Sequence, residues 1–348
     1  MDRRQLIKNL AAASLVSNGI AGMKPIALAM STVATSANSD AELNQENEWG
    51  NPVIDMHFHC RSTPKANHEH LRGAGISMAA LLTVLPDQLD IGCDTRSAYP
   101  KQFILFGGVD DTKPDAMELL RIAVKQDIRG IGELSGFNIA INGQEMGRIY
   151  DFAAEMNAPV IVHFQDYASA DGSHFFRDPV GFVRPQFKKL EEALRMHPKT
   201  TFIGHGPAFW GNLGPEGDSL NYPSGPVRPG GLTERLLSDY GNLYGGLDAS
   251  SGINALHRDL NFAHRFIEKH SHKLIFGGDC MCTDGRGGTD KIYPPITQKM
   301  RDENPMVNLV VGKCLARVQL DQLKRLAEPS IFRRITWENG RRLLRLDS

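Results

Sequence analysis

The chain has 348 residues, a formal net charge of −1 and a hydrophobic content of 41%. This length suits one large α/β barrel or two ordinary domains. The balanced charge gives no electrostatic reason to expect nucleic acid or an anionic membrane as a partner. The five cysteines are an odd number, are widely spread and form no C-x-x-C pair, which excludes a disulfide framework. We interpret Cys280 and Cys282 as neighbouring buried thiols.

The N-terminus carries paired arginines followed by two aliphatic residues and a lysine (Arg3-Arg4-Gln5-Leu6-Ile7-Lys8). A modestly hydrophobic, alanine-rich stretch continues to about Met30, so this segment resembles a twin-arginine export signal. We expect residues 1–37 to be the signal peptide and residues 38–50 to be a polar linker. The resemblance implies the twin-arginine export machinery as a partner, a periplasmic or secreted location, and no membrane span once the signal is removed. The alternative is an amphipathic cytosolic helix.

Downstream of the linker, apolar runs typical of β-strands recur, and helical patterns lie between them. The predicted strands cover residues 53–59, 76–85, 103–109, 128–134, 159–164, 200–205, 242–248 and 273–279. The predicted helices include residues 114–126, 144–156, 184–196 and 254–270. A helical tail over 305–346 is expected to close the barrel or to pack across its end.

Strands that alternate with helices predict parallel pairing through right-handed crossovers. Eight such units in about 300 residues are the number that a (β/α)8 TIM barrel requires. We therefore expect one α/β barrel over residues 51–348, with its site at the C-terminal ends of the strands. An open doubly wound sheet with a small second domain is the alternative. No G-x-G-x-x-G follows the first strand, so a dinucleotide-binding version of that sheet has no support.

The first predicted strand ends in two histidines separated by one residue. Because a strand projects alternate side chains to the same face, His57 and His59 should point together, while Met56 and Phe58 point away. Two imidazoles at the end of a buried strand form half of a metal site. An H-x-H pair alone is weak, since short motifs arise by chance.

Other predicted strands also end in residues that bind metals. The further candidates are Glu133, His163, His205 and Asp279. Strand ends in a closed barrel converge, and histidine with carboxylate oxygen suits zinc, manganese or iron(II). We predict one or two divalent ions and expect zinc. Most of the remaining histidines are interpreted as surface residues: His68, His70, His174, His197, His257, His264, His270 and His272.

This set of strand-end residues resembles the amidohydrolase superfamily over about residues 51–346. The segments Asp55–His59, Gly204–Gly206, Leu247–Gly252 and Phe276–Asp279 are similar to the amidohydrolase-related branch, which also contains decarboxylases of the aminocarboxymuconate-semialdehyde and resorcylate type. Glu133 stands where a lysine for carbamylation would be expected. A glutamate there resembles the bridging ligand of TatD-like nucleases, so the site could hold one metal or two.

The resemblance implies metal-assisted hydrolysis of an amide, lactone or ester in a small, carboxylated or cyclic substrate. A metal-activated water would attack, and Asp279 would take its proton and pass it to the leaving group. His205 would bind a second metal or polarise the substrate carbonyl. The alternatives are metal-dependent non-oxidative decarboxylation of an aromatic or unsaturated carboxylic acid, and a periplasmic binding protein without turnover. The resemblance also implies a homodimer as one possible assembly.

Two long connections, residues 165–183 and 206–231, follow predicted strands that end in histidine. Long loops at this face of a barrel are where substrates are recognised. We name Arg177, Arg184 and Arg228 as candidates to bind a carboxylate. Candidates to cover a ring are Phe209, Trp210 and Tyr222.

Overall fold

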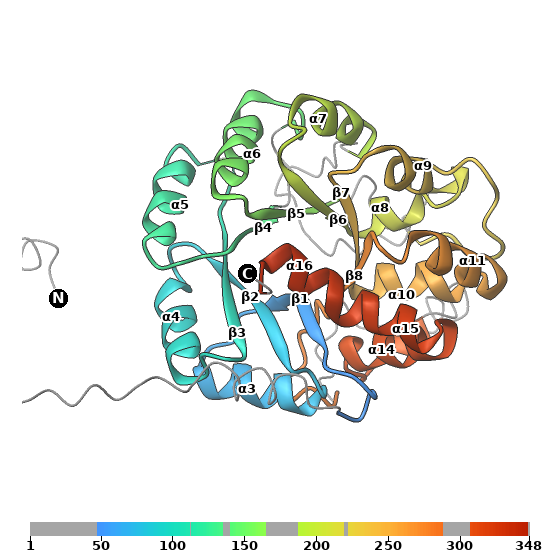
Figure 1. Ribbon diagram of the computed structural model, residues 1–348, viewed down its shortest axis with the longest axis horizontal. Helices are drawn as coiled ribbons and strands as arrows, with labels where there is room; N and C mark the ends of the chain where they lie inside the picture. Colours follow the sequence, from blue (N-terminus) through green and yellow to red (C-terminus); the bar gives the residue numbers. More distant parts are fainter. Residues whose placement is uncertain are drawn as a thin grey trace, which may run out of the picture. The chain divides into compact units, whose positions relative to one another are not determined.

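Eight parallel strands form one sheet in the order β1 to β8, surrounded by helices (Figure 1). The computed structural model describes residues 47–111, 113–134, 140–164, 187–218, 222–287 and 307–346. The strands are β1 (Ile54–His59), β2 (Met78–Val84), β3 (Phe103–Gly108), β4 (Gly130–Leu134), β5 (Pro159–His163), β6 (Thr201–His205), β7 (Leu243–Leu247) and β8 (Leu274–Phe276). All eight predicted strands are confirmed, and their parallel pairing gives a (β/α)8 TIM barrel.

The ring of strands is joined between its first and last members at the C-terminal end. The backbone N–H of Asp279 donates to the His57 carbonyl at 2.8 Å, and the N–H of Gly278 donates to Asp55 Oδ1 at 2.8 Å. Asp55 Oδ1 also accepts from the His57 N–H at 2.9 Å. The segment after β8 is therefore held against β1, which carries the two histidines of the first strand.

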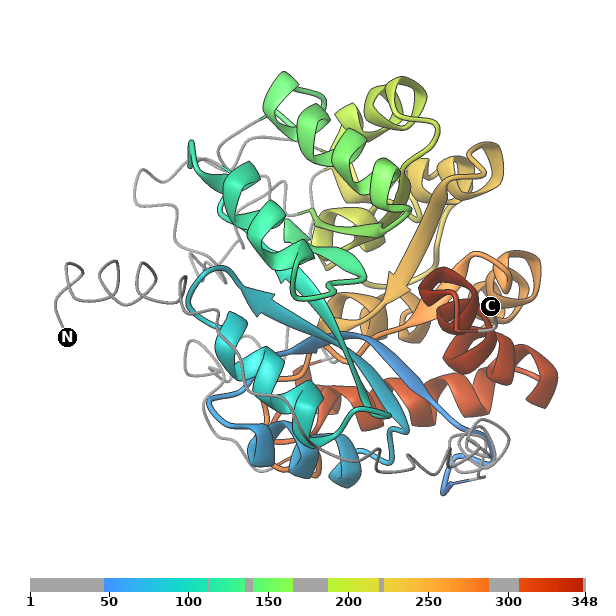
Figure 2. The same cartoon turned by 60° about the vertical axis from the view of Figure 1, so that its left-hand side comes forward.

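Helices alternate with the strands and cover the outside of the barrel (Figures 1 and 2). They are α3 (Pro64–Gly73), α4 (Leu89–Ala98), α5 (Ala116–Val124), α6 (Gln144–Met156), α7 (Leu190–Met196), α8 (Pro207–Gly211), α9 (Leu232–Asp239), α10 (Ala249–His257) and α11 (Leu260–His270), with short helical turns η1 (Phe187–Lys189) and η2 (Pro215–Asp218). The single helix predicted over 254–270 is wrong. It is two helices, because the Asp259 side chain accepts from the Phe262 N–H and begins α11 anew.

The C-terminal tail is helical, as predicted, in its described part. It contains α13 (Val307–Val310), α14 (Leu315–Leu326), α15 (Pro329–Arg333), η3 (Arg334–Glu338) and α16 (Asn339–Leu344). Trp337 and Leu344 pack with side chains from the interior of the barrel, among them Ile54 at the start of β1. The tail therefore closes the N-terminal end of the barrel, and Figure 1 shows α16 lying across the ring. A cluster of polar side chains lies at the opposite, C-terminal end of the barrel.

The alternation predicted for the first strand is interrupted. The pairing of β1 with β2 shifts register between Asp55 and Phe58, which is a β-bulge or a similar irregularity. Met56 packs inside the barrel with Ile54, whereas Phe58 packs in the core outside it. The prediction that Met56 and Phe58 share one face is wrong. The irregularity adds one residue to β1 relative to β2 between Asp55 and Phe58, and this breaks the alternation of faces.

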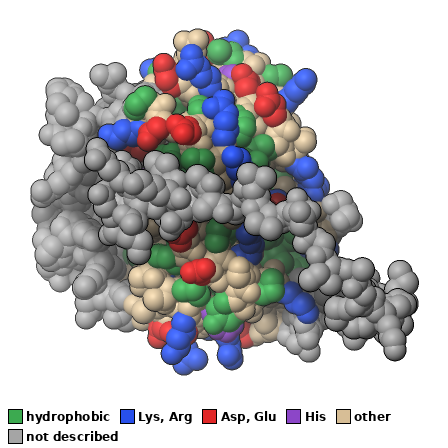
Figure 3. Space-filling view, turned by 90° about the vertical axis from the view of Figure 1, so that its left-hand side faces the viewer, with side chains coloured by type: hydrophobic (Ala, Val, Ile, Leu, Met, Phe, Trp, Pro, Cys, Tyr) green, Lys and Arg blue, Asp and Glu red, His purple; other side chains and the backbone are tan. Residues whose placement is uncertain are grey.

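The described chain is packed on the barrel slightly before the predicted boundary at residue 51. Trp49 is buried in the core, and its indole N–H donates to the Ala74 carbonyl at 3.1 Å. On the face drawn in Figure 3, the described surface mixes basic and acidic side chains with apolar ones. Among the helices of the described residues, none combines the length and apolar character needed to cross a membrane.

Candidate metal centre

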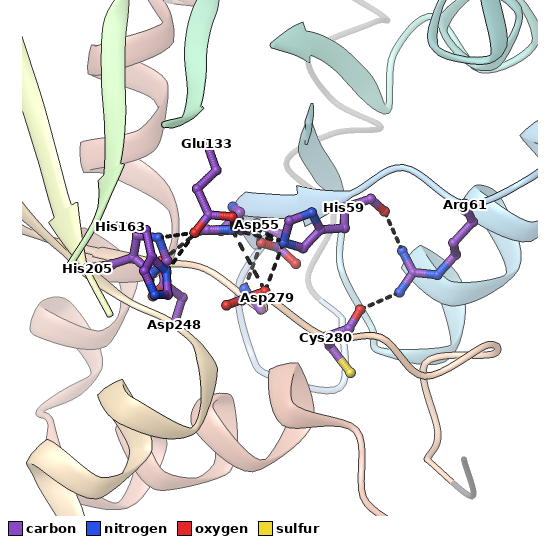
Figure 4. Close-up of polar contacts among 11 residues, drawn as sticks. Asp55, His59, Arg61, Glu133, His163, His205, Asp248, Asp279 and Cys280 are labelled. Carbon is purple, nitrogen blue, oxygen red and sulfur yellow. Dashed lines mark hydrogen bonds and ion pairs between the residues drawn. The ribbon is translucent and has the colours of Figure 1, made fainter. Parts of the chain in front are cut away.

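Polar side chains from six strand ends meet at the C-terminal end of the barrel (Figure 4). Members of this cluster fall into overlapping groups whose donor atoms all lie within 4.8 Å of one another. The cluster contains all six residues that the sequence predicts as metal ligands: His57, His59, Glu133, His163, His205 and Asp279. We call these six residues, with Asp248, the strand-end cluster.

One half of the cluster is formed by the first and last strands. His57 Nε2 and His59 Nε2 face each other at 3.3 Å, and His59 Nε2 lies 2.9 Å from Asp279 Oδ1. Two nitrogen ligands at about 2.1 Å from one ion in tetrahedral geometry are about 3.4 Å apart. The spacing of the two imidazoles therefore fits a shared cation. The His57 nitrogen is 3.8 Å from the same aspartate oxygen.

Glu133 joins this half of the cluster to the other. Its Oε1 is 2.7 Å from His205 Nε2 and 2.8 Å from His163 Nδ1. Its Oε2 faces the first half, 3.6 Å from His57 Nε2 and 3.7 Å from His59 Nε2. One carboxylate therefore presents one oxygen to each pair of histidines, an arrangement that suits a ligand shared by two ions.

Backbone conformation at two points allows this convergence. Gly132, immediately before Glu133, has φ +141°, and a Cβ there would lie 2.8 Å from the Ile161 Cβ, so glycine is required. Asp279 has φ +42°, in the left-handed region, which costs about 1 kcal/mol for a residue with a Cβ. The hydrogen bond from the Asp279 N–H to β1 offsets this cost.

Asp248, at the end of β7, was not among the predicted site residues. Its Oδ2 is 3.1 Å from His57 Nδ1 and its Oδ1 is 2.9 Å from His205 Nδ1, so one buried carboxylate orients both rings. These contacts of Asp248 at Nδ1 leave each Nε2 to face the centre of the cluster, the usual carboxylate–histidine–metal relation. The available signal was an aspartate that ends the seventh predicted strand, as Asp279 ends the eighth.

The electrostatics of the cluster favour a cation. Burial alone would raise the pKa values of Glu133 and Asp279, but neighbouring histidines outweigh it and hold both pKa values low. Burial would lower the pKa of His57, yet Asp279 and Asp248 raise it well above the usual value. Burial is likewise outweighed at His205, where Asp248 contributes most to raising the pKa to about 9. The carboxylates are thus ionised, and a cation binding there must displace protons from the imidazoles.

The residue types therefore fit a divalent metal, by donor chemistry and by spacing. Four imidazoles and two carboxylates provide nitrogen and oxygen ligands without a thiolate, which suits zinc, manganese or iron(II). The first half offers His57, His59 and Asp279, and the second half offers His163 and His205. Glu133 can serve both halves.

The predicted substrate contacts fare less well. Arg177 and Arg184 lie outside the described residues. The prediction for Trp210 is wrong: it is buried, donates to the Gly246 carbonyl at 2.8 Å and packs edge-to-face against Phe209, which is also buried. Arg228 is largely exposed, and its ion pair is with Glu216, which is not a member of the strand-end cluster.

Tyr222 is the ring candidate that the structure connects to the cluster. Its hydroxyl is 3.0 Å from Ser250 Oγ, on the helix that follows Asp248. Burial, and to a smaller extent the Asp279 carboxylate, raise the pKa of Tyr222 to about 12. The hydroxyl is therefore neutral at physiological pH and remains a hydrogen-bond donor near Asp279.

Two of the histidines interpreted as surface residues are buried. His70 and His270 are only 1% and 2% exposed, because α3 and α11 turn these faces toward the core. His174 lies outside the described residues. His70 and His270 are therefore exceptions among the histidines of which most were interpreted as surface residues.

We expect Asp248→Asn to weaken metal binding about 10- to 100-fold, because an amide cannot accept from both imidazole N–H groups. Competition with a chelator of known affinity measures this change. Asp239→Asn is the matched control, since Asp239 is exposed at the end of α9. Unchanged metal affinity in Asp248→Asn, at unchanged thermal stability, would contradict the positioning role of Asp248.

Neither a protein-family model nor a curated protein sequence matches this chain. Solved structures do match it. The 4-oxalomesaconate hydratase of Rhodopseudomonas palustris superposes with a TM-score of 0.53 at 14% identity, over 85% of this chain and 96% of that one. A probable 2-pyrone-4,6-dicarboxylic acid hydrolase of Acinetobacter baumannii, with citric acid bound, superposes with a TM-score of 0.51 at 15% identity, over 84% and 98% of the two chains. What they share with this chain is the fold.

Proposed function

We propose that this protein is a divalent-metal-dependent hydrolase acting on an ester, lactone or amide of a small, carboxylated or cyclic substrate. The observation that carries the proposal is the placement of Glu133, with one carboxylate oxygen directed to each pair of histidines. Such a shared carboxylate would suit a site that holds two ions, as two-metal hydrolytic sites do. His57, His59 and Asp279 would hold one ion, and His163 and His205 the other.

The chemistry that a bound divalent ion supplies is Lewis acidity and a lowered pKa of water, which allows hydrolysis near neutral pH. Asp279 lies on the side of the cluster that is most accessible to solvent, with 19% of its side chain exposed beside a 27% exposed His59. Its ionised carboxylate can accept a proton from the attacking water and deliver it to the leaving group. Asp248 keeps His57 and His205 in one orientation throughout.

A carboxylated or cyclic substrate is supported by the names of the two structural neighbours. One is a hydratase and the other a probable hydrolase of a pyrone dicarboxylic acid, and both names describe reactions with water. Tyr222 offers a neutral hydroxyl close to Asp279 that can donate to a substrate oxygen. Decarboxylation of an unsaturated or aromatic acid is the competing reaction, because the same ligands could hold its metal.

Oxygen-18 water separates the two reactions. The metal-loaded protein is incubated with panels of lactones, esters and amides of dicarboxylic acids and with aromatic carboxylic acids. Incorporation of one labelled oxygen into a product, lost on chelation and restored by metal, is the expected result. Release of carbon dioxide, with no labelled oxygen in the organic product, would replace the hydrolase with a decarboxylase. Tight binding of a panel member without any product would favour a binding protein instead.

We propose zinc as the resident metal, because the ligands are mainly imidazole nitrogen. We also propose export through the twin-arginine route, on the basis of Arg3 and Arg4 and the alanine-rich stretch that follows. Recovery of a processed chain from the periplasm, with lysine at both positions blocking its appearance there, tests the export proposal. Wild-type levels of the double lysine variant in the periplasm would contradict it.

A further inference from the structure

Three cysteines and a histidine form a second cluster beside the barrel. Cys280 Sγ lies 3.4 Å from Cys282 Sγ and 3.7 Å from Cys314 Sγ, and Cys282 Sγ lies 3.5 Å from His70 Nδ1. All four residues are buried, and their four donor atoms lie within 4.8 Å of one another. We call them the cysteine cluster. None of the four belongs to the strand-end cluster.

The four residues come from three separate parts of the chain. His70 is on α3, Cys280 and Cys282 are in the segment after β8, and Cys314 precedes the first residue of α14. Spacing along the chain places Cys280 beside Cys282 but does not indicate that His70 or Cys314 lies near them. Burial of these two thiols agrees with the interpretation of Cys280 and Cys282 as neighbouring buried thiols, and the structure adds a third thiol and an imidazole.

The distances match those of ligands around one ion rather than those of bonded sulfurs. A disulfide requires sulfurs about 2.05 Å apart. In a tetrahedral zinc site with Zn–S of about 2.3 Å, sulfurs are about 3.8 Å apart and sulfur and nitrogen about 3.6 Å apart. The separations observed here, 3.4, 3.7 and 3.5 Å, are close to those values.

A backbone N–H group points at one of the sulfurs, as such groups do around metal-bound thiolates. The Leu315 N–H donates to Cys280 Sγ at 3.2 Å, and the backbone N–H groups of Gly285 and Gly287 lie near the Cys282 thiol. Both glycines have positive φ, and a Cβ at Gly285 would overlap the His70 carbonyl. The segment after Cys282 thus turns back on its own sulfur while packed on α3. Donors of this kind stabilise negative charge on sulfur.

His70 is positioned to complete the set. Its Nδ1 also lies 2.9 Å from the Cys282 carbonyl oxygen. In the tautomer protonated at Nδ1, this nitrogen donates a hydrogen bond to that oxygen. Coordination through Nδ1 requires the tautomer protonated at Nε2, a change within the neutral ring. Phe58 packs edge-to-face on the His70 ring and limits its rotation.

We propose that His70, Cys280, Cys282 and Cys314 form a structural zinc site of the Cys3His type, which fixes the segment after β8 to α3 and α14. Three thiolates and one imidazole are a closed, four-ligand set without room for substrate chemistry, and soft sulfur selects zinc over magnesium or calcium. Zinc binding releases the thiol protons to solvent and forms the metal–sulfur bonds.

The proposed site lies next to the catalytic machinery. Cys280 directly follows Asp279, and the Arg61 guanidinium donates to the carbonyls of His59 and Cys280 at 2.9 and 2.7 Å (Figure 4). It also donates to the Cys282 carbonyl at 3.1 Å. The zinc site would therefore brace the segment that holds Asp279 against the end of β1. The proposal does not depend on the hydrolase assignment, because a structural metal is compatible with any activity.

X-ray absorption at the zinc edge tests the proposal on the full-length wild-type chain. The strand-end cluster contains no sulfur, so zinc–sulfur scattering at about 2.3 Å identifies the cysteine cluster. We expect this scattering in the zinc-loaded protein. We also expect a sulfur-to-cobalt charge-transfer band after cobalt substitution. Zinc-replete protein with only nitrogen and oxygen neighbours would overturn the proposal, as would a disulfide between cluster cysteines in non-reducing peptide mapping.

Variants assign the signal to the cluster. Cys314→Ser and Cys282→Ser should each lower zinc content by about one ion per chain and abolish the zinc–sulfur signal. Cys93→Ser should change neither, because Cys93 lies on α4 outside the cluster. Retention of the full zinc–sulfur signal in both cluster variants would refute the assignment. Loss of turnover in Asp279→Asn with zinc–sulfur scattering intact would show that the strand-end cluster can be altered without a change in the cysteine cluster. Should a cluster variant fail to fold, the wild-type spectrum alone decides.

Discussion

Asp279→Asn is expected to lower kcat/KM by about 10³-fold on the substrate identified by oxygen-18 labelling, because an amide cannot carry the proton. Asparagine keeps the size of the side chain and an oxygen that can still contact a cation. Metal content should therefore remain close to that of the wild-type protein. The loss should appear mainly in kcat, since the substituted group acts on the reacting atoms rather than on substrate binding.

Two measurements make this result specific. Asp90→Asn, at an exposed position on α4, is the matched control and should retain full activity. Metal analysis of Asp279→Asn separates a proton carrier from a ligand: loss of the metal together with activity would assign Asp279 to metal binding alone. Near-normal turnover would refute any catalytic role for this aspartate.

Glu133→Gln is expected to convert a two-ion centre into a one-ion centre. Glu133 directs one carboxylate oxygen to each pair of histidines, and glutamine offers only one oxygen and no charge. Manganese loading followed by electron paramagnetic resonance is the measurement of choice, because two ions that share a bridging carboxylate give an exchange-coupled spectrum. Manganese also prefers oxygen and nitrogen ligands, so it reports the strand-end cluster and not the cysteine cluster.

The wild-type protein should bind two coupled manganese ions, and the variant about one uncoupled ion. Glu118→Gln, exposed on α5, is the matched control and should bind as the wild type does. A single ion in the wild type, insensitive to Glu133 but lost in His57→Ala, would favour a mononuclear lactonase or decarboxylase. No manganese or zinc under any loading condition would remove the metal-dependent proposal altogether.

The barrel could be predicted because its signals are local. Each strand is a short apolar run, and the helices between them have their own periodicity, so the number and order of the strands are readable from the sequence. Residues that end these runs share one end of any parallel barrel. That rule alone identified Glu133, His163, His205 and Asp279 as neighbours. The two-helix structure over 254–270 was missed, because the capping aspartate Asp259 interrupts a continuous amphipathic pattern.

The finer features depended on contacts between distant segments. Asp248 matters because it reaches His57, 191 residues away in the sequence, and no periodicity along β7 indicates that partner. Trp210 looked like a site residue because it follows His205, yet packing of α8 turns it into the core. The irregularity in β1 likewise places Phe58 outside the barrel, although Met56, two residues before it, lies inside.

The barrel and the residues at its strand ends follow from the order of apolar and polar residues along the chain. The position of Glu133 between two pairs of histidines, and the contact of Asp248 with two of them, arise only when the strands pack together. Tertiary packing also brings His70 and Cys314 to Cys280 and Cys282. The physical reason is that side chains from separate elements meet only when those elements pack, and packing depends on the whole core rather than on any local pattern.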